Sequence, residues 1–254
     1  MVRHKEARVE QEKQNLQAEL TDRLRSIRRD RVDAWIVARG DAGLAGEDTA
    51  RLDAHFKAMT REDLGAGIPA RYADWSLQDF KATAAREMVR FIEDESVSTL
   101  FLHGGVGTGK TTLAAAVLRG WRWSGGACSF ACPENCGLRL GTASLFLPAY
   151  EAADKLRDLD GCRDAMARWA GVRFLVLDDI GANRSTPHVT EQLLFLLQRR
   201  YDHVQKTVVT SNLDLDGIHN ALGERAASRL QQGLLVELTG GDKRGGSSER
   251  KVER

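Results

Sequence analysis

A glycine-rich run between an apolar segment and a helix-forming segment is the clearest chemical signal in this sequence. It fits the pattern G-x-x-x-x-G-K-[ST] and consists of Gly104, Gly105, Val106, Gly107, Thr108, Gly109, Lys110 and Thr111. Glycines let backbone N–H groups surround a phosphate, and the start of the following helix favours negative charge at the same place. We expect Lys110 to reach the β- and γ-phosphates of a nucleotide and Thr111 to ligate Mg²⁺, and we count Thr112 with the nucleotide-binding residues.

A second signal is the apolar run FLVLDD at 174–179, which ends in two acidic residues. If the run is a buried strand, Asp178 and Asp179 stand at its carboxyl end, where ligands bind in open α/β sheets. We expect Asp178 to hold the Mg²⁺ shell, as a Walker B aspartate does, and Asp179 to polarise the attacking water. The alternative is a strand that ends in an ordinary polar turn, which would be common for a lone aspartate.

Two further segments carry candidate polar groups. The run TVVTSN at 207–212 is typical of another buried strand and ends in Asn212, whose amide can orient a water near the γ-phosphate. Asparagine at a strand end is more often a turn residue. Arg225 and Arg229 are four residues apart and share one face of a helix. Composition alone makes them solvent-facing, whereas in a nucleotide-hydrolysing oligomer such a pair can stabilise charge at a neighbour's γ-phosphate.

These residues need a sheet to hold them, and the chain predicts one. Near-continuous apolar runs alternate with helical patterns, which indicates an α/β fold with a parallel sheet covered on both faces. The expected strands are 98–103, 144–148, 172–178, 207–211 and 234–238. The expected helices are 83–93, 109–121, a helical stretch to about 169, 188–204 and 219–231.

The N-terminal region, residues 1–62, is rich in charge and poor in strand-forming residues. One narrow helical stripe of apolar side chains runs through it, formed by Leu16, Leu20, Leu24 and Ile27. A stripe of this kind indicates a helix that packs against a partner or a neighbouring domain, so we expect a helical partner-binding region. The arginine-rich stretch that follows the stripe is either a solvated face or a nucleic-acid contact.

The rest of the chain divides into three parts. Residues 63–81 form a linker, broken by glycine and proline, whose aromatic residues suggest that it packs down on something. Residues 82–239 form the core, and residues 240–254 form a mobile tail.

Composition excludes several classes of protein. The net charge is +1, so the overall charge of the chain does not indicate a nucleic-acid-binding protein. No window approaches the roughly 18 consecutive apolar residues of a membrane-spanning helix, and the charged N-terminus has no signal-peptide core. We therefore expect a cytoplasmic protein without membrane contact. The four cysteines are expected to be reduced thiols. Cys128, Cys132 and Cys136 either bind zinc or belong to an inserted loop.

Taken together, these motifs resemble the AAA+ ATPases of the DnaC/IstB-like group. The likeness covers roughly residues 63–244 and is carried by LVLDDIG (175–181), TSNL (210–213) and GERAASRL (223–230), in addition to the glycine-rich run. The phrase GIPARYADWSLQDF (67–80) resembles the helicase-loader branch of the group. The resemblance implies an AAA+ P-loop NTPase core, here without room for a separate lid domain.

The resemblance also implies roles for individual residues. Asn212 would be sensor 1, Arg229 would be an arginine finger acting in trans, and Arg225 would support it. Arg244 lies roughly where the family often carries a sensor-2-like arginine, so we count it with the nucleotide-binding residues. The pair Asp178–Asp179 replaces the Asp-Glu of many AAA+ proteins, which suggests slow hydrolysis.

The implied function is an ATP- and Mg²⁺-dependent ATPase that loads a DnaB-type replicative helicase onto single-stranded DNA. Such a protein assembles into a homo-oligomer, grips the hexameric helicase and hydrolyses ATP when stimulated by assembly or DNA. The segment 181–190 would offer Arg184, Thr186 and His188 to the DNA backbone, although Thr186 and Pro187 also suit a helix cap. The alternatives are an IstB-like ATPase helper of a DNA transposase and a nucleotide-binding adaptor without useful turnover.

Overall fold

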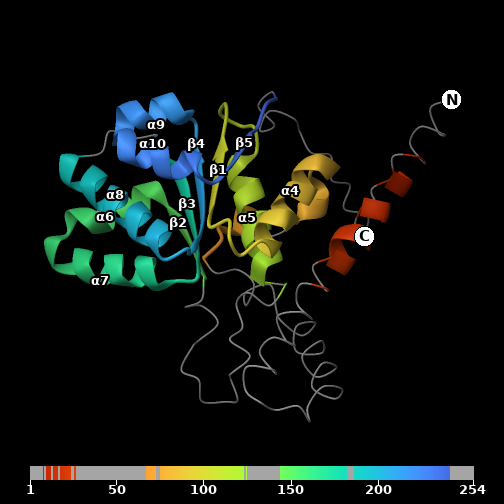
Figure 1. Cartoon of the computed structure of the whole chain (residues 1–254), viewed down its shortest axis with the longest axis horizontal. Helices are drawn as coiled ribbons and strands as arrows, with labels where there is room; N and C mark the ends of the chain where they lie inside the picture. Colours follow the sequence, from red (N-terminus) through yellow and green to blue (C-terminus); the bar gives the residue numbers. More distant parts are fainter. Residues whose placement is uncertain are drawn as a thin grey trace, which may run out of the picture.

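The computed structural model describes residues 8, 10–12, 14–16, 18–23, 26, 67–72, 75–122, 124, 144–181 and 186–240. Within these ranges the predicted α/β fold is confirmed, with a five-stranded sheet between helices (Figure 1). The strands are β1 (Thr99–His103), β2 (Ser144–Pro148), β3 (Phe174–Ile180), β4 (Lys206–Ser211) and β5 (Leu234–Glu237). The helices are α4 (Ala82–Glu93), α5 (Lys110–Trp121), α6 (Ala149–Arg157), α7 (Leu159–Gly171), α8 (Pro187–Asp202), α9 (Leu215–Leu222) and α10 (Glu224–Gln231).

The strand order is β2-β3-β4-β1-β5, and every neighbouring pair is parallel. β4 therefore lies between β1, which leads into the glycine-rich run, and β3, which carries the two acidic residues. The carboxyl ends of all five strands meet at one edge of the sheet, so this order places the end of β4 between the other two motifs. The sheet order thus brings together three segments that are far apart in the sequence.

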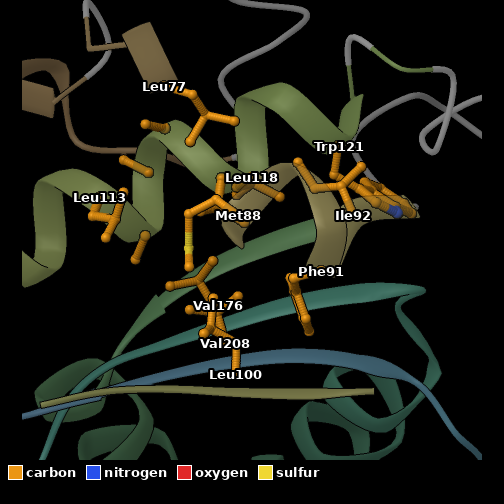
Figure 2. Close-up of a cluster of buried hydrophobic side chains, with 14 of the residues drawn as sticks. Leu77, Met88, Phe91, Ile92, Leu100, Leu113, Leu118, Trp121, Val176 and Val208 are labelled. Atoms are coloured by element: carbon orange, nitrogen blue, oxygen red, sulfur yellow. The ribbon is translucent and has the colours of Figure 1, made fainter. Parts of the chain in front are cut away.

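Helices cover both faces of the sheet, as parallel strands with buried faces require. Helices α4 and α5 lie on one side, and α6 to α10 lie on the other (Figure 1). Successive side chains of a strand point to opposite faces of the sheet and so contribute to both hydrophobic clusters. Leu100 and Val176 pack with α4 and α5, whereas Phe101 and Leu177 belong to the cluster on the opposite face. Figure 2 shows the first cluster, in which α4 and α5 contribute Met88, Phe91, Ile92, Leu113, Leu118 and Trp121.

Some element boundaries differ from the sequence prediction. The prediction of a single helix at 219–231 is wrong. Helix α9 begins at Leu215, and Gly223 separates it from α10. Gly223 has φ 93°, a left-handed conformation that glycine adopts without steric cost. Asp214 caps α9 by accepting a hydrogen bond from the backbone N–H of Gly217 at 2.8 Å. The strand expected at 172–178 is displaced and spans Phe174–Ile180.

The segment predicted as a linker packs on the core where the structure describes it. Leu77, in the short 3₁₀ helix η2 (Leu77–Asp79), is buried in the cluster with α4 and α5. Arg119 of α5 donates a hydrogen bond to the backbone oxygen of Trp75 at 2.6 Å. This segment therefore packs against α5, as its aromatic residues suggested.

The described part of the N-terminal region also contacts the core. Leu16 and Leu20 are buried in the cluster with α4 and α5, so these two residues of the predicted stripe pack against a neighbouring part of the chain, and partner binding by this region stays a prediction. Arg86 of α4 binds Glu19 through two nitrogens, each at 2.7 Å. Leu24, Ile27, the three cysteines at 128–136 and Arg244 lie outside the described residues. None of the described helices is long and apolar enough to cross a bilayer.

Candidate nucleotide-binding site

The glycine-rich run forms the turn between β1 and α5, as predicted. Gly104, Gly107 and Gly109 have φ values of 137°, 79° and 99°, a conformation that favours glycine. At Gly104 the need is also steric, because a Cβ atom there would lie 2.3 Å from the backbone oxygen of Leu238. The chain after β5 is held this close by a 2.7 Å hydrogen bond from the Leu238 N–H to the His103 oxygen.

Lys110 is the first residue of α5, and its side chain spans the loop. Its Nζ donates to the backbone oxygens of Gly104 at 2.9 Å and Gly105 at 2.7 Å, and the residue is only 6% exposed. These bonds keep the ammonium group within the loop and at the start of α5. A helix N-terminus and a buried ammonium at one place form a site for an anion such as a phosphate.

The two acidic residues of β3 lie in a β-bulge. Leu177 pairs with Val209 and Ile180 pairs with Ser211, so Asp178 and Asp179 together stand opposite the single residue Thr210. Asp179 has φ 63°, which is uncommon for a residue other than glycine. A bulge re-aims the side chains that follow it. Asp178 is accordingly buried, at 8% exposed, whereas Asp179 is exposed.

Asp178 accepts hydrogen bonds from two hydroxyl groups. Thr210 donates to its Oδ1 at 2.7 Å, and Thr111 of α5 also hydrogen-bonds to it. Burial raises the pKa of Asp178 above its usual range, against the opposing effect of the two hydroxyls. The structure therefore brings together Thr111 and Asp178, the two residues that the sequence predicted as Mg²⁺ ligands.

Asn212 lies beside Asp179 at the end of β4. Its Nδ2 donates to Asp179 Oδ1 at 3.1 Å, and both side chains are exposed. The two residues that the sequence assigned to the lytic water are thus neighbours. Sequence reasoning missed Thr210, although it lies two residues before Asn212, a spacing that puts both on one face of an extended chain.

The two arginines of α10 lie apart from this cluster. Arg229 donates from Nε to Gln198 Oε1 of α8 at 2.8 Å, and its guanidinium lies 4.6 Å from the centre of the Tyr201 ring. Tyr201 in turn hydrogen-bonds to Gln232. Arg225 is exposed. In the described part of the chain, the polar contacts of Arg229 are with α8 and not with the glycine loop.

The segment after β3 is described only in part. Thr186 caps α8 by accepting a hydrogen bond from the Val189 N–H at 3.4 Å, and Pro187 occupies the first turn. The capping prediction for these two residues is confirmed. His188 is exposed, and Arg184 lies outside the described residues, so DNA contact by this segment stays a prediction.

The chemistry of these residues fits a magnesium-bound nucleoside triphosphate. Lys110 and the N-terminus of α5 suit the phosphates, and a hydroxyl next to a carboxylate suits Mg²⁺, which binds few protein oxygens and completes its shell with phosphate and water. Within the described ranges, no group of three or more histidine, cysteine, aspartate or glutamate side chains is placed to hold a metal by itself.

Comparison with known proteins shows which proteins this chain is similar to. No family model matches the sequence. The replicative helicase loader DnaC of Buchnera aphidicola subsp. Schizaphis graminum (strain Sg) is 24% identical over 223 residues, which are 81% of this chain and 82% of that protein.

Solved structures agree on the fold. The structure of a DnaC helicase loader matches with a TM-score of 0.54 and 22% identity over 67% of this chain and all (100%) of that one. DnaI matches with a TM-score of 0.52 and 23% identity over 73% and 94% of the two chains. The initiator DnaA bound to AMPPCP and single-stranded DNA matches with a TM-score of 0.54 and 18% identity over 68% of this chain, which spans about half, 51%, of that one.

The chain therefore has the fold of a class of replication proteins that includes the DnaC helicase loader and the initiator DnaA. Within that class, the resemblance to the DnaC-like proteins, first indicated by the motifs, is confirmed.

Replacing Asp178 with asparagine is expected to raise the melting temperature of the nucleotide-free protein near neutral pH. Because burial raises the pKa of Asp178, the folded state keeps its proton to a higher pH than the unfolded chain. Stability therefore falls as pH rises from the ordinary aspartate pKa through the raised value, and the loss stays constant above it. Thermal unfolding at a series of pH values measures the effect.

The matched control is Asp216→Asn, which changes an exposed aspartate on α9 and should leave the melting temperature nearly unchanged. The advantage of Asp178→Asn should shrink as the pH falls to the ordinary aspartate pKa. A variant that is less stable than the wild type at every pH would contradict this account of Asp178.

Proposed function

We propose that this protein binds and hydrolyses ATP with Mg²⁺. The observation that carries the proposal is the contact between Thr111, beside the phosphate-binding Lys110, and the buried Asp178 at the end of β3. Two motifs that are distant in the sequence meet there, with the residue types and order that an Mg²⁺-nucleotide site needs. AMPPCP, an ATP analogue, is bound in the DnaA structure that shares the fold, which supports the same ligand here.

Each residue has a distinct part in the proposed reaction. Lys110 and the backbone of residues 104–109 would bind the phosphates, while Thr111 and Asp178 would hold Mg²⁺. Bound Mg²⁺ would supply positive charge to the phosphate oxygens. Asp179 accepts a hydrogen bond from the attacking water and orients it, and Asn212 holds the carboxylate of Asp179 in place. Arg229 acts on the site of a neighbouring subunit, with Arg225 beside it.

We further propose that the protein loads a DnaB-type replicative helicase onto single-stranded DNA. The curated relative is named a replicative helicase loader, and the alignment covers most of both chains. ATP hydrolysis would be slow and would increase with assembly or DNA. The N-terminal region would bind the hexameric helicase, and the buried Leu16 and Leu20 join the described part of that region to the core.

The loader proposal predicts a complex with the replicative helicase of the same cell. Wild-type protein should co-migrate with the hexameric helicase on a sizing column, and ATP should change the amount of complex. Lys110→Ala should lose that response to ATP, because it lacks the phosphate contact, while keeping any nucleotide-independent binding.

If no complex forms with or without ATP, the result would contradict the loader proposal. In that case, ATP-dependent binding and bending of duplex DNA would support a transposase helper. If a complex forms but the protein hydrolyses ATP under none of the conditions tested, the result would support a nucleotide-binding adaptor instead.

A further inference from the structure

The hydroxyl group of Thr210 contacts both acidic residues of β3, namely the side chain of Asp178 and the main chain of Asp179. It donates to Asp178 Oδ1 at 2.7 Å and accepts a hydrogen bond from the backbone N–H of Asp179 at 2.8 Å. A hydroxyl has one hydrogen, so the backbone N–H fixes which way that hydrogen points. Thr210 is 1% exposed, which leaves the geometry little freedom.

This arrangement compensates for the bulge. Because Asp178 and Asp179 share one partner position on β4, a bulged residue loses its regular ladder bond. The Thr210 side chain accepts the Asp179 N–H that the bulge would otherwise leave without a partner on β4. The same contact stabilises Asp179 at φ 63°, a conformation that disfavours most side chains.

The Thr210 hydroxyl also restricts the Asp178 carboxylate. With Oδ1 bonded to a rigid strand, the rotation of the carboxylate about its Cβ–Cγ bond is set, and so is the direction of its other oxygen. Thr111 hydrogen-bonds to the same carboxylate. The orientation that Thr210 imposes is therefore the one that the predicted Mg²⁺ ligand pair would use.

The end of β4 thus controls both acidic residues. Thr210 holds Asp178 by its side chain and Asp179 by its main chain, and Asn212 holds Asp179 by its side chain at 3.1 Å. We propose that Thr210 is a positioning residue that sets the geometry of the Mg²⁺-nucleotide site through Asp178 and Asp179. This inference rests on the proposed ATP and Mg²⁺ binding.

Thr207 on the same strand provides a matched control. It is also buried, and its hydroxyl also makes two hydrogen bonds, accepting from Arg200 Nε at 2.9 Å and donating to the Gln205 oxygen at 2.9 Å. It lies near the amino end of β4, away from the acidic residues. Thr207→Val therefore removes a buried hydroxyl of the same kind without touching the site.

The test compares Thr210→Val, Thr210→Ser and Thr207→Val in the full chain. The first readout is the Mg²⁺ concentration that gives half of the magnesium-dependent increase in affinity for a fluorescent, non-hydrolysable ATP analogue. For Thr210→Val we expect this concentration to rise about 10-fold or more, since partners that orient metal ligands typically contribute 10- to 100-fold to metal affinity. Affinity in EDTA should change little, because Lys110 and the loop are intact.

The other two variants separate positioning from folding. Thr210→Ser keeps the hydroxyl and should restore the wild-type Mg²⁺ requirement. Thr207→Val should lower the melting temperature but leave the Mg²⁺ requirement unchanged. Steady-state ATPase gives a second readout, in which Thr210→Val should lower kcat more than it raises KM for Mg²⁺-saturated ATP. If Thr210→Val does not fold, Thr210→Ala takes its place.

An unchanged Mg²⁺ requirement in the folded Thr210 variant would overturn the inference and leave the proposed function standing. An equal increase in Thr207→Val, or no rescue by Thr210→Ser, would also overturn it, because the effect would then be one of general packing. Wild-type protein that binds no ATP analogue with or without Mg²⁺ would overturn the proposed function itself, and the inference with it.

Discussion

Replacement of Lys110 by alanine is expected to weaken ATP binding by about 10- to 100-fold. A hydrogen bond to a charged group contributes roughly 1.5–3 kcal/mol, and each 1.4 kcal/mol corresponds to about tenfold in affinity. The side chain also bridges the loop through the oxygens of Gly104 and Gly105, so its loss frees the loop as well as removing the charge. Titration with a fluorescent ATP analogue measures the change.

Two controls make this result specific. Lys155→Ala removes an exposed lysine on α6 and should bind ATP as the wild type does. The melting temperature of Lys110→Ala without nucleotide shows whether the loop change has destabilised the whole domain. Wild-type affinity and turnover in Lys110→Ala would mean that the glycine-rich run is not the phosphate site.

Replacement of Arg229 by alanine is expected to abolish the stimulation of hydrolysis in the assembled protein while leaving ATP binding intact. Arginine residues that act on a neighbour's γ-phosphate typically contribute about 10³- to 10⁵-fold to turnover. Arg229 suits such a role because Gln198 and Tyr201 of α8 hold its side chain in a defined position. ATPase rates measured above and below the concentration at which the protein assembles test this expectation.

A mixing experiment tests whether Arg229 acts between subunits. Lys110→Ala protein keeps Arg229 but lacks its own phosphate contact, and Arg229→Ala protein has the reverse defect. Mixed in one assembly, they should regain part of the wild-type activity, because some interfaces pair an intact loop with an intact arginine. No recovery in assemblies that contain both variants would contradict action in trans.

Arg225→Ala is the natural comparison for Arg229→Ala. The two arginines are one turn apart on α10, but Arg225 is exposed, whereas Arg229 is held by two contacts with α8. We therefore expect a smaller loss of activity for Arg225→Ala, in keeping with a supporting role. A larger loss for Arg225→Ala would exchange the roles of the two residues.

The sequence by itself determined the local features of this protein. The glycine loop, its position between a strand and a helix, and the acidic end of an apolar run all depend on neighbouring residues, and their spacing is visible without a structure. The apolar runs likewise predicted all five strands of the sheet. Lys110, Thr111 and Asp178 could be named in this way because each stands at a fixed place in a short pattern.

Other features depended on the tertiary structure. The position of β4 between β1 and β3 results from pairing between distant segments, and no local pattern specifies it. The bulge at Asp178 and Asp179 is a property of two strands together, so the contacts of Thr210 with both acidic residues could not be seen from the sequence of either strand. The contact of Arg229 with α8 could not be seen from the sequence either, because it depends on how the two helices pack in the folded domain. These contacts join residues far apart in the chain, and only folding decides which of them meet.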